Sequence, residues 1–174
     1  MSYVNGPITL GADHLSNTAT YEVQRTNNFE LVIEGFGDDF TLSVDGTNLP
    51  TSSNEAIELA YGNTKVKVAG QASFDDVTVT VKDVIGADME AKLWEWRKQV
   101  YDPETDKIGW AKDYKRGAFL YQYAPDGTFL RPWKLKGAWP SSFESSEFAY
   151  DGSDKKIITL TLSVDKAYPY KENN

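Results

Sequence analysis

Apolar and polar residues alternate with a period of two over much of this chain. The alternation covers residues 28–35, 40–44, 65–69, 76–82 and 157–164. Successive side chains of a strand point to opposite faces, so each run predicts a strand with one apolar and one polar face. That arrangement is typical of antiparallel sheets, which pack one face on a core and leave the other in solvent.

One segment has the period of a helix instead. Its apolar stripe consists of Met89, Leu93, Trp96 and Val100. Side chains at these spacings lie on one side of a helix, and Asp88 is a suitable N-cap residue. The Asp102-Pro103 step limits the helix at its other end. We therefore predict a helix over 88–100, in a mainly β fold: an antiparallel β-barrel or sandwich with one packing α-helix.

Turn residues divide the chain further. Asp126-Gly127, placed between the alternating residues 119–123 and Phe129, predicts a tight hairpin. Residues 45–54 are polar, contain Gly and Pro, and lie between two alternating runs, so they predict an extended hairpin arm. The resulting division is an N-terminal extension over 1–20, a β domain over 21–168 and a C-terminal tail over 169–174.

Composition narrows the class of protein. The chain has 174 residues, which suits one domain, and 26 acidic against 18 basic residues give a net charge of −8. This balance argues against binding to a phosphate backbone, which needs clustered cations. The sequence contains no cysteine, so disulfides and zinc–thiolate sites are excluded. The sequence has no long apolar run and no signal-like start, which predicts a soluble protein without membrane anchoring.

Candidate catalytic or metal-binding residues are few. His14 is the single histidine, and nothing around it indicates a Ser–His–Asp triad. Residues 102–113 have the acidic spacing of a calcium loop, but Lys107 stands where that loop needs glycine. A solvated acidic loop is the simpler interpretation. The sequence therefore predicts a protein that is not an enzyme, with no metal site and no cofactor.

Aromatic residues allow two interpretations. The chain has five tryptophans and ten tyrosines, and Trp94, Trp133 and Trp139 lie off the helix stripe or near strand ends. They can pack against the core, or they can anchor a subunit interface, where aromatic side chains are enriched. A carbohydrate-binding platform is a further alternative.

Three stretches resemble a known family. They are NNFELVIEGF, VKVAGQASFDDVTVTVKDVIG and DGTFLRPWKLKGAWPSSFESSEFAYDGSDKKIITLTLSVD. Over residues 27–165 the chain resembles the tail tube proteins of contractile-tailed bacteriophages. The third stretch is the most specific, because its Asp-Gly hairpin, Ala-Trp-Pro step, Asp-rich turn and final strand follow one another in the order typical of that family.

The resemblance implies a structural protein of the virion that is assembled in the host cytoplasm. Copies would form hexameric rings, with strands joined across subunits, and the rings would stack into a tube. Implied partners are the tail sheath, baseplate and tail terminator proteins, and DNA would pass through the lumen without specific binding. Tubes of type VI secretion systems or phage-tail-like particles, and less so a carbohydrate-binding β module, are the alternatives.

The resemblance also suggests roles for particular residues. We expect these polar side chains to face the lumen: Glu30, Glu34, Thr41, Ser43, Lys65, Lys67, Asp76, Thr78, Thr80 and Lys82. Their charges cancel, which predicts a neutral or acidic bore. We expect these arm residues to contact the next ring: Thr47, Asn48, Leu49, Pro50, Thr51, Ser52 and Ser53. Trp94, Trp133 and Trp139 are the expected interface aromatics.

Overall fold

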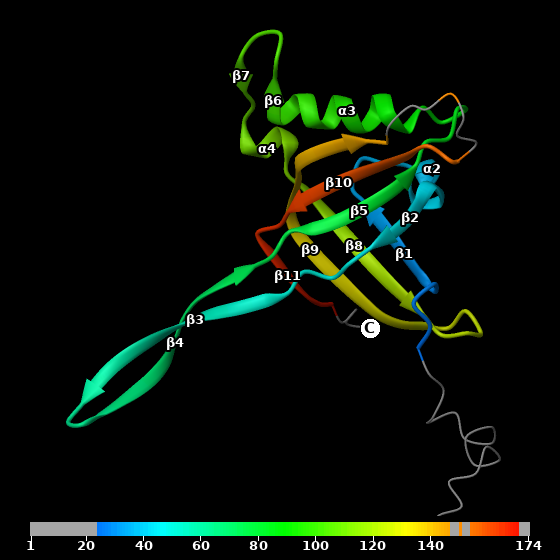
Figure 1. Cartoon of the computed structure of the whole chain (residues 1–174). Helices are drawn as coiled ribbons and strands as arrows, with labels where there is room; N and C mark the ends of the chain where they lie inside the picture. The colour runs from blue at the N-terminus through cyan, green and yellow to red at the C-terminus, as the bar shows by residue number, and fades with distance from the viewer. Residues whose placement is uncertain (1–23, 147–149, 151–153, 171–174) are drawn as a thin grey trace, which may run out of the picture.

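Two packed antiparallel layers form the body of the protein (Figure 1). The computed structural model describes residues 24–146, 150 and 154–170. Hydrogen-bonded strands follow the order β1-β8-β9-β10-β5-β2, and β11 also pairs with β9. Their bounds are Phe29–Ile33 (β1), Val44–Thr47 (β2), Val77–Lys82 (β5), Arg116–Tyr123 (β8), Phe129–Ser145 (β9), Ile157–Ser163 (β10) and Lys166–Pro169 (β11). Thus β1 and β2 are the two ends of the strand order.

Strand β9 belongs to both layers. The first part of its 17 residues pairs with β8 and β11, and the last part pairs with β10. We call β1-β8-β9-β11 the first layer and β9-β10-β5-β2 the second layer. Gly137 lies between the two parts with a φ of +66°, a conformation that glycine adopts without strain. A β-carbon there would also lie 2.1 Å from the Asp165 side chain, so the crossing requires glycine.

The core lies between the layers and consists of alternate residues of each strand. Buried side chains include Leu31, Ile33, Val77, Val79, Val81, Ala118, Leu120, Leu135, Ile158, Leu160 and Leu162. Full burial of a Val, Leu or Ile side chain contributes about 1.5–3 kcal/mol relative to its exposure. The apolar faces predicted for 28–35, 76–82 and 157–164 are confirmed, as is the mainly β, antiparallel fold.

Helix α3, Met89–Val100, covers one end of the sandwich (Figure 1). The four residues of its apolar stripe are buried, as predicted, and Asp88 Oδ1 accepts the Ala91 N–H at 3.3 Å as an N-cap. The indole N–H of Trp96 donates to the Tyr114 carbonyl at 2.8 Å, which ties α3 to the short helix α4, Ala111–Tyr114. A small hairpin of β6, Tyr101–Asp102, and β7, Lys107–Ile108, connects the two helices.

The hairpin arm exists, but not at the predicted residues. It consists of β3, Ser52–Tyr61, and β4, Thr64–Phe74, which within the described residues pair only with each other and project far from the body (Figure 1). Residues 45–47, expected to belong to the arm, are part of β2, which pairs with β5. The alternation of 65–69 suited a strand of the body equally well, because period-two alternation does not identify a strand's partner.

The predicted strand over 40–44 is wrong. Residues Asp38–Ser43 form helix α2, in which Phe40 and Ser43 are buried while Leu42 is 81% exposed. Two acidic residues, Asp38 and Asp39, occupy its first turn, where they interact favourably with the helix dipole. The buried residues Phe40 and Ser43 are therefore three positions apart, as in a helix, whereas the predicted strand required buried residues two positions apart.

The hairpin predicted at Asp126-Gly127 is confirmed. It joins β8 to β9, with Gly127 at a φ of +83° and the Thr128 N–H donating to Asp126 Oδ1 at 2.9 Å. The N-terminal extension over 1–20, including His14, and most of the C-terminal tail lie outside the described residues. Within the described part of the chain, none of the helices has the length and apolar character needed to cross a bilayer.

Candidate assembly surfaces

The strands at the two ends of the strand order have unpaired backbone edges, and β11, which in the described chain pairs only with β9, has another. Among the described residues, β1 pairs only with β8, and β2 pairs only with β5. An unpaired edge presents backbone N–H and C=O groups that can add another strand. Because β1 and β2 end opposite sides of the strand order, one copy offers two different edges, as a closed ring of identical copies requires.

The arm has one apolar and one charged face. Ile57 lies directly opposite Val68, and Leu59 directly opposite Val66; all four side chains are 42–49% exposed. Opposite residues of an antiparallel pair share a face. On the other face, Glu58 forms ion pairs with Lys65 at 2.8 Å and Lys67 at 3.6 Å.

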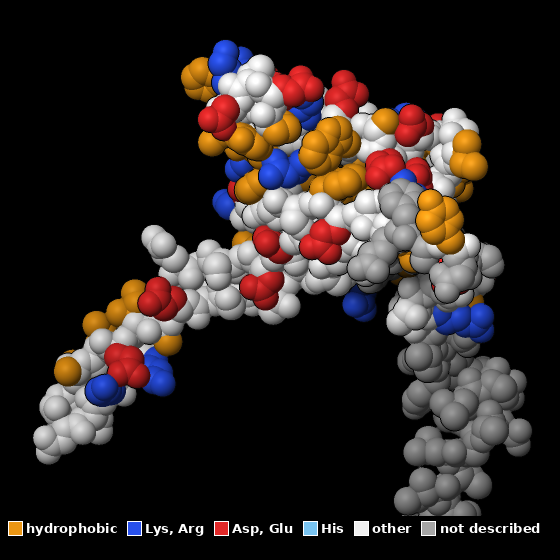
Figure 2. All heavy atoms as spheres, turned by 45° about the horizontal axis from the view of Figure 1, so that its top comes forward, with side chains coloured by type: hydrophobic (Ala, Val, Ile, Leu, Met, Phe, Trp, Pro, Cys, Tyr) orange, Lys and Arg blue, Asp and Glu red, His pale blue; other side chains and the backbone are white. Residues whose placement is uncertain are grey.

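Nothing in the described chain covers the apolar side of the arm. Figure 2 shows apolar and charged side chains along its exposed length. An isolated two-stranded hairpin is marginally stable in water, and exposed apolar rows favour association. The arm is therefore suited to lie against another protein surface.

The residues predicted to contact the next ring instead join the arm to the body. Asn48 Oδ1 accepts the Thr78 N–H at 2.6 Å, and the Thr51 carbonyl accepts the Asp75 N–H at 3.0 Å. Leu49 packs partly against the core. Only Ser52 and Ser53 belong to β3, at the end nearest the body. The sequence missed the apolar face of the arm because its pattern matches that of a core strand.

The residues predicted to face the lumen do not share one surface. Glu30 lies on β1, Lys65 and Lys67 lie on the arm, and Thr41 and Ser43 lie on α2. Ser43 is buried, and its hydroxyl donates to the Asp39 carbonyl at 2.6 Å. Glu34 and Asp76 lie just outside strands. The remaining three belong together on β5: Thr78, Thr80 and Lys82.

Those three residues belong to a hydroxyl-rich outer face of the second layer. Across β10 and β9 this face continues as Thr159, Thr161, Ser163 and Ser142, with Thr78 opposite Thr161 and Thr80 opposite Thr159. Its charges are balanced: Lys82 pairs with Asp45 at 2.9 Å, and Glu144 lies opposite Thr159. Lys155 and then Lys82 hold the pKa of Asp45 below its usual value through hydrogen bonds. We call this surface the hydroxyl face.

The outer face of the first layer has a different chemistry. Phe119 stacks beside Tyr121 at a centroid distance of 6.0 Å, and Tyr121 contacts Phe129 at 5.4 Å. The ammonium group of Lys134 lies 5.0 Å from the Phe119 ring centroid and 5.4 Å from that of Tyr170. Cations over aromatic rings make this face more suited than the hydroxyl face to binding anions or proteins.

The expected interface tryptophans occupy different environments. Trp94 is 46% exposed and meets the edge of Phe143 at 5.5 Å, whereas Trp133 packs partly against the core. Trp139 is half-buried beside Tyr114, at 5.8 Å. Their role at an interface stays a prediction. Trp110, which follows β7, is 77% exposed and was not among the predicted interface residues.

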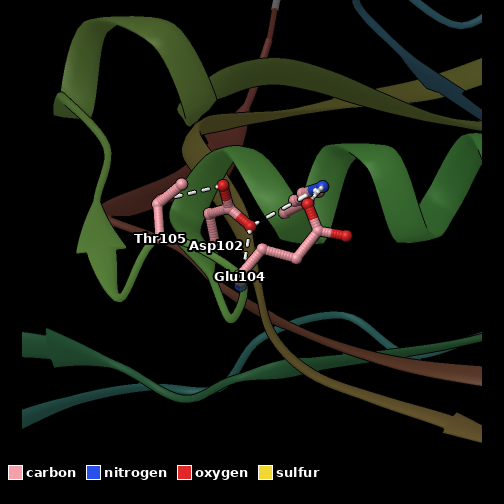
Figure 3. Close-up of polar contacts among 4 residues, drawn as sticks. Asp102, Glu104 and Thr105 are labelled. Atoms are coloured by element: carbon pink, nitrogen blue, oxygen red, sulfur yellow. Dashed lines mark hydrogen bonds and ion pairs between the residues drawn. The ribbon is translucent and has the colours of Figure 1, made fainter.

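The acidic loop after α3 is held by its own hydrogen bonds (Figure 3). Asp102 Oδ2 accepts the Thr105 hydroxyl at 2.9 Å, while Oδ1 accepts the Glu104 N–H at 3.1 Å and lies 3.6 Å from Lys98 Nζ. These contacts, the Thr105 hydrogen bond first, lower the pKa of Asp102. Both carboxylate oxygens therefore stabilise the turn, and this arrangement differs from an open set of calcium ligands.

Comparisons with known proteins agree on one family. The family described as T4-like virus tail tube protein gp19 matches residues 25–167. The chain is 31% identical to tail tube protein gp19 of Enterobacteria phage T4 over 144 residues, which are 81% of this chain and 88% of that protein.

Solved structures share the fold at lower identity. One is the tube terminating cap of the anti-feeding prophage, with a TM-score of 0.71, 16% identity and coverage of 96% of this chain and 100% of that chain. Another is the sheath–tube complex of an extracellular contractile injection system in its extended state, with a TM-score of 0.66 and 16% identity. That match covers 92% of this chain and 97% of the other chain.

Proposed function

The chain belongs to the tail tube protein family of T4-like viruses, and from this premise we propose that copies of it join by strand edges and arms into a hollow tube. It is a structural component of the virion, a tail tube protein of the kind found in contractile phage tails and related injection systems. In this proposal the protein assembles into the tube, the tube conducts DNA, and no reaction is catalysed.

Ring closure follows from the two unpaired edges. Pairing the β1 edge of one copy with the β2 edge of the next would satisfy the backbone groups that both strands leave open. Repeated around a hexameric ring, that contact would remove the exposed edges of β1 and β2 and join the sheets into a continuous barrel.

Stacking of rings is assigned to the arm. The observation that carries the proposal is the uncovered row of Ile57, Leu59, Val66 and Val68, which projects away from the body. Covering these half-exposed side chains with an adjacent ring would remove apolar area from water, at roughly 25 cal/mol per Å². We therefore assign the contact with the next ring to the apolar face of residues 57–68, in place of the residues 47–53 expected from the sequence.

We assign the bore to the hydroxyl face. A conduit for DNA must avoid clustered cations, because each contact with a phosphate releases counterions and holds the polyanion in place. The hydroxyl face has balanced charges, whereas the aromatic face of the first layer includes Lys134 and Lys136. DNA would pass along the hydroxyl face without specific binding, and the tube would deliver the genome to the host cell.

Proposed partners follow the premise: the tail sheath around the tube, with baseplate and terminator proteins at its ends. Similar structures include a sheath–tube complex and a tube terminating cap, and these share the fold at 16% identity. A tube of an injection particle that conducts proteins is the second candidate, favoured by the same fold likeness. Identity of 31% to a T4 protein favours the phage tail.

Electron microscopy of the purified full chain tests the proposal. We expect hollow filaments of stacked rings at high protein concentration. A variant with Ile57 and Leu59 both replaced by serine should form rings without long tubes. A protein that stays monomeric at every concentration and salt condition would overturn tube formation, and glycan binding by that monomer would favour the carbohydrate-binding alternative.

A further inference from the structure

A cavity lies beside α3, at the end of edge strand β1. It has a volume of about 260 Å³ and is lined by the Gly35–Gly37 loop, Phe40 of α2, one side of α3 and Arg116. Arg116 is the first residue of β8, the strand that pairs with β1. The cavity therefore lies at the C-terminal end of β1, the strand to whose free edge another copy is proposed to add.

The guanidinium of Arg116 is held in a fixed orientation within this cavity. Its central carbon lies 4.9 Å from the Phe36 ring centroid and 5.2 Å from that of Trp96. Gly35, at a φ of +85°, passes so close that an added β-carbon would lie 2.6 Å from Arg116 Nη1. Because Trp96 is itself buried and hydrogen-bonded to Tyr114, the stacking surface is rigid.

The charge of Arg116 is not balanced by a bound carboxylate. Nη1 donates to the Glu34 carbonyl at 3.2 Å, and Nη2 donates to the Gln99 side-chain oxygen at 3.4 Å; both acceptors are neutral. No ion pair joins it to an acidic group of the described residues, in contrast to Lys115, which pairs with Asp165 at 2.7 Å. A guanidinium has five N–H donors, so several are still available.

Burial makes this arrangement costly for a cation. Desolvation lowers the pKa of Arg116 below its usual value, and the charge of Glu95, which also lines the cavity, offsets only part of that effect. A partly buried guanidinium packed against two aromatic rings is suited to bind a carboxylate through two parallel hydrogen bonds.

We propose that this cavity receives an aspartate or glutamate side chain from a second copy of the chain when copies assemble. The inference rests on the proposed tube, and it adds a specific ionic contact to the edge pairing. A second copy is the indicated source because the cavity lies at the end of edge strand β1 and each chain carries eight more acidic than basic residues. The volume is enough for one side chain and its carboxylate.

Zero-length crosslinking of the R116K variant tests the contact directly. The substitution places an amine in the cavity, and a carbodiimide couples amines only to carboxylates in direct contact. Tubes grown from an equal mixture of nitrogen-15-labelled and unlabelled R116K protein distinguish contacts between copies from contacts within one copy. We expect a crosslinked peptide with residue 116 on one isotope and an Asp or Glu peptide on the other.

Crosslinks of residue 116 only to Glu95 of the same copy, in well-formed tubes, would overturn the inference while leaving the proposed function intact. Absence of tubes from the unsubstituted protein would overturn both. As a second measurement, R116Q should raise the protein concentration needed for tube growth roughly tenfold, the effect of losing one charge-assisted contact. R131Q removes an exposed arginine outside the cavity and should leave that concentration unchanged; equal behaviour of the two variants would contradict the inference.

Discussion

Ile57 of β3 lies directly opposite Val68 of β4 on the same exposed face of the arm. These residues alternate like core residues, but within the described chain they lie outside the hydrophobic core and stay half-exposed. Folding of the body and growth of the tube therefore depend on different apolar residues.

The first prediction concerns that face. Ile57→Ser should block stacking of rings while leaving the free energy of unfolding of the body within about 0.5 kcal/mol of the original, because the side chain is half-exposed and distant from the core. Tube length by negative-stain microscopy and thermal unfolding of the dissociated protein measure the two effects.

Ala60→Ser is the matched control, because Ala60 is exposed on the arm opposite Lys65, on the charged face. It should form tubes of normal length. Equal loss of tubes from both substitutions would show that the arm acts through its backbone and not through its apolar side.

The second prediction concerns the crossing point of β9. Gly137→Ala should lower the free energy of unfolding by about 2–4 kcal/mol, since it adds a clash with Asp165 to the cost of a left-handed conformation. Gly127→Ala, in an open turn at a φ of +83°, lacks the clash and should cost only about 1–2 kcal/mol. Urea unfolding of both variants measures the difference, and equal costs would argue against the contact with Asp165.

The third prediction concerns alkaline pH. The Tyr123 hydroxyl donates to Glu30 at 2.6 Å, which raises the pKa of Tyr123 to about 12. Because the folded state holds this proton more tightly than the unfolded chain, the stabilisation is complete below about pH 10 and is lost as the pH rises towards about 12.

Glu30→Gln should reduce that pH dependence, because the hydrogen bond to a charged acceptor contributes most to the raised pKa. The difference between the urea midpoints of the original protein and of the Glu30→Gln variant should shrink as the pH rises from about 10 to about 12. Tyrosinate absorbance of the folded protein provides a second measurement. A difference that stays constant with pH would be inconsistent with a coupled Glu30–Tyr123 pair.

The fourth prediction concerns the bore. Thr159→Lys would place a ring of cations on the hydroxyl face, so tubes of this variant should retain DNA at low salt and release it as salt increases. Thr128→Lys adds the same charge at the β8–β9 turn, away from that face, and should not retain DNA within the tube. If only the Thr128→Lys variant retained DNA, a surface other than the hydroxyl face would have to line the bore.

Much of the fold could be predicted from residue patterns, but not all of it. The faces of β1, β5 and β10 and the buried stripe of α3 followed from periods of two and three to four residues. Helix α2 was missed because Phe40, Leu42 and Val44 alternate by chance within a segment whose acidic first turn favours a helix. The arm was misplaced because the alternation of 65–69 is the same for a strand that finds a sheet and for one that does not.

The candidate surfaces were less predictable. Thr78, Thr80 and Lys82 belong to one face, as the alternation of β5 indicated, but their neighbours Thr159 and Thr161 come from a strand about eighty residues later. The cavity of Arg116 combines residues of a loop, a helix and a strand from distant parts of the chain. No local pattern marks such a site.

By itself, the sequence determined which side of β1, β5, β10 and helix α3 is apolar, because the direction of a side chain follows from the backbone period. Its similarity to known proteins also determined the family. Only the tertiary structure decided which apolar faces are covered within one chain and which are left for another. Burial depends on pairs of surfaces brought together by the whole fold, and a single segment contains only one member of each pair.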